Sequence, residues 1–557
     1  MKKRDPARRN KSLKEGHISF SKTFERLEKN RMCPYLKKFL ERYENMPIGP
    51  GLWLSTALFI IFVRDGIECF IASGFFGGPD DFHLVHVPIF FFSLLLSLII
   101  ILHFFAKTDI LKVSKIALVV FPLIIFPVVL DFAVLIFGKT RTTYLYIVDN
   151  PGLSFLHFFD PMYRIPELPL SIRFEVGLIT FFAFVYIFLK RRKVFASLIG
   201  SFLVFILCFF YVSIPALLLK VFEFMAFIIN TFHLKNFPFV RATVDEVLVV
   251  LLEVLFTGVL CLVWLWRYDP AKYSAVLKNV RPTRTLHYMF LCFVGVLVSV
   301  FHSPIKDFFS LLYIVGALLS VGFAFQFSVV INDIYDLDCD RVSNAGRPLV
   351  TGALNKREYL RIGFFYLAFS ILCAYWVGPT CFTLTLLFIA FYFLYSAPPL
   401  RLKRFFPVSV LVIGLQAVLA FLIGAYTFER SGVRAYLPAL LLWLIFIVFF
   451  FSSNIKDLKD ISGDRETGIP TLPVLLGEEK GRKVIAFLVF LSYCLVPLFL
   501  GFVFPGFKAY LITLLFALLS FICIQKKSTK EEIIFLIYFI YVILLIFYIT
   551  SLKSLAG

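Results

Sequence analysis

Residues Asn332–Arg341, with the sequence Asn-Asp-Ile-Tyr-Asp-Leu-Asp-Cys-Asp-Arg, end a long apolar run and contain the pattern Asp-x2-Asp-x3-Asp-Arg. The same pattern recurs within Asn454–Arg465, again at the end of an apolar run. On a helix, positions i, i+3 and i+7 fall within roughly 60° of one another, so each pattern places three carboxylates on one face. Such a concentration of like charge is unfavourable unless a cation lies between the carboxylates. The two segments therefore predict a site for metal-bound diphosphate.

The predicted metal ligands are the aspartates that share these faces: Asp333, Asp336 and Asp340 in the first segment, and Asp457, Asp460 and Asp464 in the second. Mg²⁺ is typically bound by carboxylate oxygens together with the phosphate oxygens of a substrate, so each triplet would hold one Mg²⁺ and a diphosphate would bridge the two. Asn332 and Asn454 offer neutral ligands or hydrogen bonds that orient the carboxylates. Asp338 lies on the opposite helical face and is predicted not to be a ligand.

The composition indicates a membrane protein. Of the 557 residues, 60% are hydrophobic and 18% are aromatic, which is more apolar side chain than a soluble domain buries. The formal charge of +20 comes from basic residues in short loops between apolar runs, where the positive-inside rule expects them, so it does not indicate nucleic-acid binding. The ten cysteines lie mostly inside apolar segments without a paired spacing, which argues against a disulfide framework or a zinc site.

The apolar runs predict about fifteen transmembrane helices in three regions. Residues 1–50 form a basic cytoplasmic tail, residues 51–270 a transmembrane region of unknown function with about six helices, and residues 275–557 a second region with about nine. The basic stretch 267–285 divides the two transmembrane regions. When the tail is placed in the cytoplasm and the sides alternate, both acidic segments and the loop between them lie on the cytoplasmic side.

Residues from about 275 to the end resemble the UbiA superfamily of intramembrane prenyltransferases. The resemblance is carried by both aspartate segments, by Arg347-Pro348 after the first, by the loop Tyr395–Lys403, and by Thr471-Leu-Pro473 after the second. It implies an all-α bundle of nine transmembrane helices around a central cavity, in which the two aspartate motifs bind Mg²⁺ and a prenyl diphosphate. The amino-terminal region departs from this pattern, because prenyltransferases of this kind typically have nine helices.

The resemblance also implies roles for individual side chains. Arg347, Lys403 and Arg401 would polarise the departing diphosphate together with Mg²⁺ as the carbon–oxygen bond breaks. Lys456 and Lys459, interleaved in the second motif, are further cations. The residues expected to be catalytic are Asp336, Asp340, Asp460, Asp464, Arg347 and Lys403. Those expected to bind substrate are Asn332, Arg341, Tyr395, Arg401, Arg404, Asn454 and Lys459.

The sequence therefore predicts a Mg²⁺-dependent enzyme that transfers an isoprenyl group from a polyprenyl diphosphate to an acceptor at the cytoplasmic face of the membrane. The expected acceptor is the aromatic ring of a quinone-type precursor or a similar molecule. Prenyl transfer to a glycerol phosphate or phosphosugar hydroxyl in lipid biosynthesis is the alternative on the same scaffold. A different class stays open, namely a non-enzymatic lipid-binding receptor or transporter in which the acidic motifs hold a cation.

Overall fold

The computed structural model describes residues 32–73, 81–136, 151–163, 165, 168–231, 246–302, 309–429, 437–500, 507–526, 528 and 530–556. These residues form helices joined by loops and contain no strand, so the all-α prediction is confirmed. Within them, 13 helical segments are long and apolar enough to cross a membrane, four before residue 212 and nine after residue 281. The chain is therefore an integral multi-pass membrane protein. The expected total of about fifteen helices is not confirmed by this number.

The chain forms two compact units. The first contains residues 1–221 and 256–268, and the second contains residues 222–255 and 269–557. One boundary between the two units, at residues 268 and 269, falls in the basic stretch 267–285. Residues 222–255 are grouped with the second unit although they precede that boundary. Most of the predicted tail, residues 1–31, lies outside the described residues.

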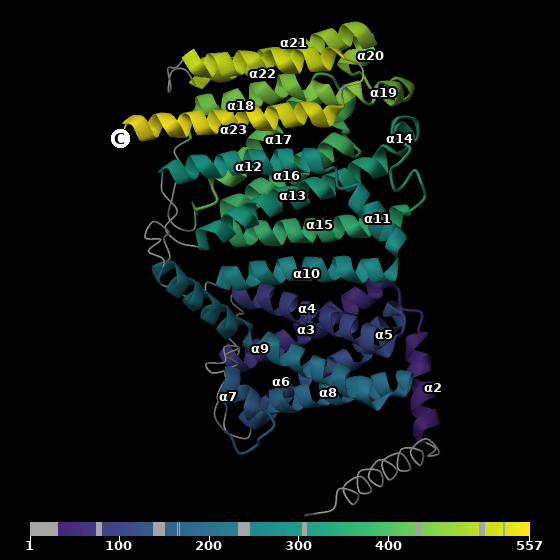
Figure 1. Ribbon diagram of the computed structural model, residues 1–557. Coiled ribbons are helices and arrows are strands. Elements are labelled where there is room, and N and C mark those ends of the chain that lie inside the picture. The colour runs from purple at the N-terminus through teal and green to yellow at the C-terminus, as the bar shows by residue number, and fades with distance from the viewer. Residues whose placement is uncertain are drawn as a thin grey trace, which may run out of the picture. The chain divides into compact units, whose positions relative to one another are not determined.

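The first unit is a helical bundle with its own apolar core. Its helices are α2 (Met32–Glu44), α3 (Pro50–Ser73), α4 (Asp81–Ala106), α5 (Ile110–Val120), the 3₁₀ helix η1 (Phe121–Ile125), α6 (Phe126–Ile136), α7 (Pro151–Leu156), α8 (Leu170–Arg191), and parts of α9 (Val194–Thr231) and α10 (Glu246–Tyr268). Buried side chains of α3, α4, α5, α8 and α9 form the core. Helix α2 crosses the ends of the long helices in Figure 1. Its last residue, Glu44, accepts hydrogen bonds from Lys190 at 2.6 Å and from Tyr186 at 3.1 Å.

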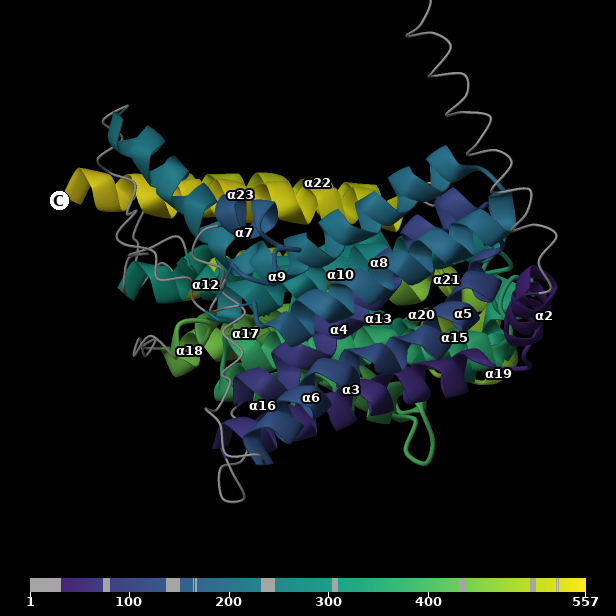
Figure 2. The ribbon, with the colours of Figure 1, turned by 90° about the horizontal axis from the view of Figure 1, so that it is seen from below.

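The second unit contains both aspartate motifs. Its helices are α11 (Pro270–Lys278), α12 (Pro282–His302), α13 (Phe309–Tyr335), α14 (Leu337–Ser343), α15 (Lys356–Val377), α16 (Pro379–Ser396), η2 (Leu402–Arg404), α17 (Val408–Ala425), α18 (Ala439–Ser452), η4 (Ser453–Leu458), α19 (Ile461–Thr467), α20 (Leu472–Leu476), α21 (Glu478–Leu500), α22 (Phe507–Gln525) and α23 (Glu531–Ala556). The long helices run side by side in Figure 1 and stay aligned in the view turned by 90° in Figure 2. The short helices α14, α19 and α20 lie at one end of them (Figure 1).

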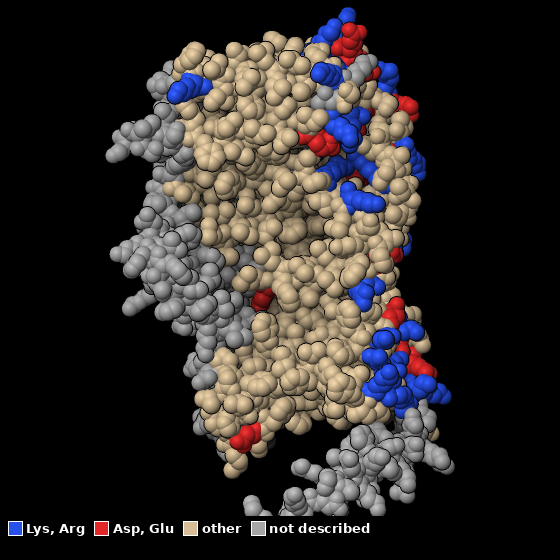
Figure 3. All heavy atoms as spheres, viewed as in Figure 1, with Lys and Arg blue, Asp and Glu red and all other residues tan. Residues whose placement is uncertain are grey.

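Local sequence explains how several of these helices begin and end. Asn355 and Glu358 form a capping box at the start of α15, and Pro379 occupies the first turn of α16, where its missing N–H costs nothing. Gly468 ends α19 in the left-handed conformation that glycine adopts without strain. The helix boundaries at Asn355 and Gly468 place the loops of the site at the end of the bundle where the charged side chains gather. On the visible face of this unit in Figure 3, charged side chains gather mainly at that end, and the surface over the long helices is almost uncharged.

The core of the second unit is built around α13 and α17, the two spanning segments with the largest buried share. Helices α12 and α17 approach each other through reciprocal glycines. A Cβ on Gly424 would lie 1.8 Å from the carbonyl oxygen of Cys292, and a Cβ on Gly295 would lie 2.0 Å from that of Phe421. Small residues permit this backbone contact, which is a common basis of helix packing in membranes.

We expect Gly424→Ala to destabilise the second unit, because the added methyl group forces α12 and α17 apart. The expected cost is about 3 kcal/mol or more, the upper range for overpacking a well-packed core. Thermal unfolding of the detergent-purified protein measures it as a lowered Tm. Gly258→Ala is the matched control, since Gly258 also lies inside a long helix but no described atom lies within 4 Å of its Cβ position. Equal Tm values for the two variants would contradict the close contact.

Candidate functional site

A cavity of about 380 Å³ lies inside the second unit. It is lined by charged residues, by valine, leucine, isoleucine and phenylalanine side chains, and by tyrosine, serine and other polar side chains. The acidic lining residues are Asp336, Asp340, Asp457, Asp460, Asp464 and Glu531, and the basic ones are Arg281, Arg284, Arg347, Lys403 and Lys456. Five of the six predicted aspartates therefore reach one cavity from segments more than a hundred residues apart.

The middle aspartates of the two motifs have the same backbone conformation. Helix α13 ends at Tyr335, and Asp336 is the N-cap of α14 with φ −106° and ψ 13°. Asp460 is the N-cap of α19 with φ −104° and ψ 11°. The expected continuous helix is therefore wrong for both motifs, because α13 ends before Asp336 and the 3₁₀ helix η4 ends at Leu458, before α19 begins at Ile461. Neither N-cap side chain bonds to the helix that it begins, so both carboxylates stay available to the cavity.

The aspartates of the first motif are paired with cations. Asp336 accepts hydrogen bonds from Lys403 and, at 3.0 Å, from Arg401. Arg347 bridges the other two aspartates, donating to Asp333 at 2.9 Å and to Asp340. Asp333 is 1% exposed and lies behind the cavity wall. It also accepts hydrogen bonds from Arg281, Asn279 and Tyr359. The negative charge of this motif is thus balanced within the protein.

Two of the arginines in these pairs have an unfavourable backbone conformation. Arg281 has φ +50° and Arg401 has φ +42°, in the left-handed region that costs a residue other than glycine about 1 kcal/mol or more. Arg281 contacts Asp333, while Arg401 donates to Asp336 and, at 2.8 Å, to the carbonyl oxygen of Tyr335. These ion pairs offset the strain. The left-handed backbone conformation in turn directs both guanidinium groups toward the first motif.

The second motif has no such compensation. Within the described residues, no Lys or Arg nitrogen lies within salt-bridge distance of Asp457, Asp460 or Asp464. Lys456, which directly precedes Asp457 in the sequence, donates instead to the hydroxyl of Tyr395. The carboxylates of the second motif are therefore not held by a direct ion pair, and a divalent cation would not have to displace a Lys or Arg side chain there, as it would at the first motif.

Direct contacts join the two motifs. Asn344 donates to Asp460 at 3.0 Å and to Asp340 at 3.3 Å, so one amide bridges a carboxylate of each motif. The backbone N–H of Gly463 donates to Ser343 at 2.9 Å. A Cβ on Gly463 would lie 2.8 Å from the carbonyl oxygen of Cys339. Helices α14 and α19 are thus held in backbone contact, and this contact fixes the separation of the two carboxylate groups.

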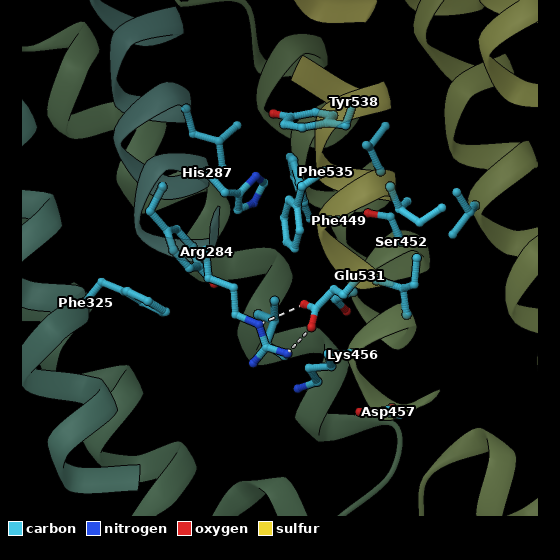
Figure 4. A pocket seen from close by; sticks show the side chains of 18 of the residues that line it. Arg284, His287, Phe325, Phe449, Ser452, Lys456, Asp457, Glu531, Phe535 and Tyr538 are labelled. Atoms are coloured by element: carbon cyan, nitrogen blue, oxygen red, sulfur yellow. Dashed lines mark hydrogen bonds and ion pairs between the residues drawn. The ribbon is translucent and has the colours of Figure 1, made fainter. Parts of the chain in front are cut away.

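An ion pair crosses the cavity farther from the motifs. Arg284 on α12 donates two hydrogen bonds of 2.8 Å to the two carboxylate oxygens of Glu531 on α23. Figure 4 shows Lys456 and Asp457 on one side of this pair, and His287, Phe449, Phe535 and Tyr538 on the other. The pair therefore separates a charged part of the cavity from an aromatic part.

Of the other predicted substrate-binding residues, only some line the cavity. Asn332 and Tyr395 line the cavity, whereas Arg401 contacts Asp336 from behind the wall. Asn454 is buried and donates to the carbonyl oxygens of Phe450 and Phe451. Arg341, Arg404 and Lys459 are exposed and do not line the cavity; the Arg341 side chain is 62% exposed and bonds to Asp338. These three residues therefore lie outside the site that we propose below.

Three charged residues that line the cavity were not predicted from the sequence. Arg281 and Arg284 lie in or beside the basic stretch 267–285, which has the composition of an ordinary cytoplasmic loop, and Glu531 begins the last helix. A signal was present, since Arg284 falls inside the spanning segment Pro282–Val300. Charged residues inside a membrane segment are functional candidates by default.

The donor set fits Mg²⁺ that is bound together with a substrate. Within the described part of the chain, no three His, Cys, Asp or Glu side chains are grouped closely enough to hold a metal alone. Mg²⁺ is usually held by one or two carboxylates, with water and substrate phosphates completing the octahedron. Two carboxylate groups that face one cavity match that requirement, and a diphosphate would supply the missing oxygens.

Burial makes one carboxyl group in each of α14 and α19 a weaker acid than usual. It raises the pKa of Asp464 to about 7, and the charges of Asp457 and Asp460 act in the same direction. Burial also raises the pKa of Asp340 to about 6, against the opposing effect of Arg347. Since a metal binds the carboxylate form, protons compete with metal at these positions near neutral pH.

We expect the Mg²⁺ concentration that gives half-maximal activity to rise about tenfold between about pH 8 and about pH 6. The sign follows from the raised pKa of Asp464, which is mostly ionised above pH 7 and mostly protonated below it. Mg²⁺ titrations of diphosphate release at several pH values measure the effect. Saturating Mg²⁺ should largely remove the pH dependence, and an unchanged Mg²⁺ requirement would contradict the competition.

Comparison with known proteins identifies a family that matches the second unit. Residues 288–543 match the UbiA prenyltransferase family. The chain is 29% identical over 163 residues to a digeranylgeranylglyceryl phosphate synthase of Pyrococcus furiosus, covering 29% of this chain and 56% of that protein. It is 26% identical over 235 residues to the protein of that name from Sulfolobus acidocaldarius, covering 41% and 80%. It is 32% identical over 157 residues to a chloroplastic homogentisate solanesyltransferase of Arabidopsis thaliana, covering 27% and 40%.

The chain spans little more than half the length of the first of these relatives. Among solved structures, it is similar to a UbiA homolog from Archaeoglobus fulgidus bound to GPP and Mg²⁺. That similarity has a TM-score of 0.39 and 24% identity, and covers 50% of this chain and 99% of the other.

Proposed function

Because residues 288–543 match the UbiA prenyltransferase family, we propose that the protein is an intramembrane prenyltransferase. It transfers an isoprenyl group from a polyprenyl diphosphate to an acceptor, with Mg²⁺ bound between the diphosphate and the aspartate motifs. The observation that carries the proposal is the cavity, which joins carboxylates of both motifs and five cations to an apolar interior. An allylic diphosphate has the matching form, since its charged head is attached to an apolar chain.

Each group of residues has a role in this proposal. Asp336 and Asp340 from the first motif, and Asp457, Asp460 and Asp464 from the second, bind Mg²⁺ and position the diphosphate. Arg347 and Lys403 stabilise the charge that develops on the leaving diphosphate, and the bound metal adds to this stabilisation. Asp333 lies behind the wall, where it orients Arg347 and Arg281. The aromatic side chains beyond the Arg284–Glu531 pair exclude water from the allylic carbon.

The site lies at the charged end of the second unit, and we propose that this end faces the cytoplasm. On the face shown in Figure 3, most of the charged side chains of the second unit lie at this end. Loops rich in Lys and Arg remain on the cytoplasmic side during membrane insertion. Cysteine labelling at Arg341, whose side chain is 62% exposed, tests the orientation in sealed vesicles of known sidedness.

The proposed activity is tested by incubating the purified protein with labelled geranylgeranyl diphosphate, Mg²⁺ and candidate acceptors. Geranylgeranylglyceryl phosphate and homogentisate represent a lipid hydroxyl and an aromatic ring, as suggested by the names of the relatives. We expect Mg²⁺-dependent release of diphosphate and a prenylated product with one of them. Mg²⁺-dependent binding without turnover on any acceptor would instead favour a lipid-binding receptor.

A further inference from the structure

The aromatic part of the cavity contains one imidazole. His287 lies one helical turn beyond Arg284 on α12, lines the cavity and is 8% exposed. Its ring centroid lies 5.0 to 5.4 Å from those of four aromatic rings: Phe449, Tyr288, Tyr538 and Phe535. Figure 4 shows His287 beside Phe535 and Phe449, on the side of the Arg284–Glu531 pair away from Lys456 and Asp457. A polar ring is thus held in otherwise aromatic surroundings.

This imidazole has unused hydrogen-bonding capacity. Its Nδ1 is enclosed and has no hydrogen-bond partner within the described residues. Two polar neighbours already have partners, since Arg284 donates to Glu531 and the hydroxyl of Tyr392 donates to that of Tyr288 at 2.8 Å. A neutral imidazole carries one donor and one acceptor nitrogen, and leaving both unpaired in a buried position is unfavourable. Because Nδ1 is enclosed, a molecule in the cavity meets the ring at Nε2.

The position of the ring restricts which ligand group can reach it. In the proposed enzyme, the diphosphate and Mg²⁺ occupy the charged part of the cavity, beside the aspartates. The allylic carbon is attached to the diphosphate and points toward the apolar interior, so an acceptor must approach it from the aromatic part. His287 lies in that part, and Asp457 of the second motif lies on the other side of the Arg284–Glu531 pair (Figure 4).

We infer that His287 is an acceptor-binding residue, whose Nε2 forms a hydrogen bond with the hydroxyl group of an amphiphilic acceptor. This inference rests on the proposed function and adds a subsite to it. The four surrounding rings hold the imidazole in place and shield the hydrogen bond from water, which strengthens it. A glycerol hydroxyl and a phenol hydroxyl share the required chemistry, and the two acceptors of the experiment distinguish them.

The experiment compares His287→Phe and His287→Gln in the full-length protein, with geranylgeranyl diphosphate, Mg²⁺ and either geranylgeranylglyceryl phosphate or homogentisate. Phenylalanine keeps a flat ring but removes both nitrogens, so we expect the KM for the acceptor to rise about tenfold, the effect of one lost hydrogen bond. The KM for geranylgeranyl diphosphate should stay unchanged. Glutamine places an amide near the position of Nε2 and should restore most of the acceptor affinity. Tyr366→Phe, which removes a hydroxyl from α15 away from the cavity, is the control.

The outcomes separate this inference from the function on which it rests. An unchanged acceptor KM in His287→Phe overturns the inference and leaves the prenyltransferase proposal intact. Equal increases in both KM values, without rescue by glutamine, indicate a structural role for His287 and also overturn it. If the wild-type protein releases no diphosphate with either acceptor, the proposed function is contradicted, and the inference with it.

Discussion

Replacing Asp336 by Asn is expected to lower the rate of Mg²⁺-dependent diphosphate release by about 100-fold or more. The carboxylate of Asp336 lines the cavity, does not cap α14, and accepts hydrogen bonds from Lys403 and Arg401. The amide keeps the size of the side chain but loses the charge that binds metal and orients both cations. Steady-state kinetics of the purified variant, with kcat and KM measured separately, give the size of the loss.

Asp338→Asn is the matched control for this experiment. Asp338 lies two residues away in the same motif, but its side chain is 85% exposed and bonds only to the exposed Arg341. A surface pair of this kind contributes little to stability. We therefore expect wild-type rates from Asp338→Asn. Equal losses in the two variants would show that overall negative charge, and not placement in the cavity, determines activity.

Gly463→Ala is expected to lower activity by about 100-fold, although Gly463 carries no reactive group. An added Cβ would lie 2.5 Å from Oγ of Ser343, 2.7 Å from Sγ of Cys339 and 2.8 Å from the Cys339 carbonyl oxygen. The hydroxyl can rotate away, but the backbone oxygen cannot, so α14 and α19 must separate. A displacement of about 1 Å is enough to misplace catalytic groups for a bridging substrate.

Two measurements test whether the effect of Gly463→Ala is geometric. Gly346→Ala is the control, since no described atom lies within 4 Å of that Cβ position in the same region of the chain. It should retain activity. The Tm of Gly463→Ala should fall only slightly although its activity falls about 100-fold, because only the two short helices α14 and α19 are displaced. Full activity in Gly463→Ala would mean that the spacing of the motifs does not limit catalysis.

The aspartate spacing predicted which carboxylates converge, but not the local structure that presents them. Five of the six aspartates line one cavity, as the repeated pattern indicates. The helical-face argument nevertheless assumed one continuous helix, and α13 ends before Asp336. Aspartate is a common N-cap residue, but the pattern alone does not show which aspartate begins a new helix. The exposure of Asp338 survives this change, because Asp338 lies in the first turn of α14 and points to solvent.

The cations were harder to predict than the carboxylates. Near a membrane surface, a basic residue in a loop has the same composition signal whether it contacts a ligand or only lipid headgroups. Arg341 and Lys459 are close in sequence to the aspartates but point outward, whereas Arg284 is distant in sequence and points into the cavity. Which of them faces inward depends on helix rotation and tertiary packing, and a single sequence contains neither.

The unequal pairing of the two motifs implies an order of binding. Within the described residues, no basic side chain pairs directly with the second motif, so in the proposed enzyme a first Mg²⁺ would bind there without displacing a Lys or Arg side chain. Arg347 and Lys403 pair with the aspartates of the first motif, and in the proposed enzyme an incoming diphosphate would attract these cations to itself. Asp336 and Asp340 would then be free to hold a second Mg²⁺, so metal and substrate would strengthen each other's affinity. We expect calorimetric titration to detect one Mg²⁺ per free protein and a second only when diphosphate is present.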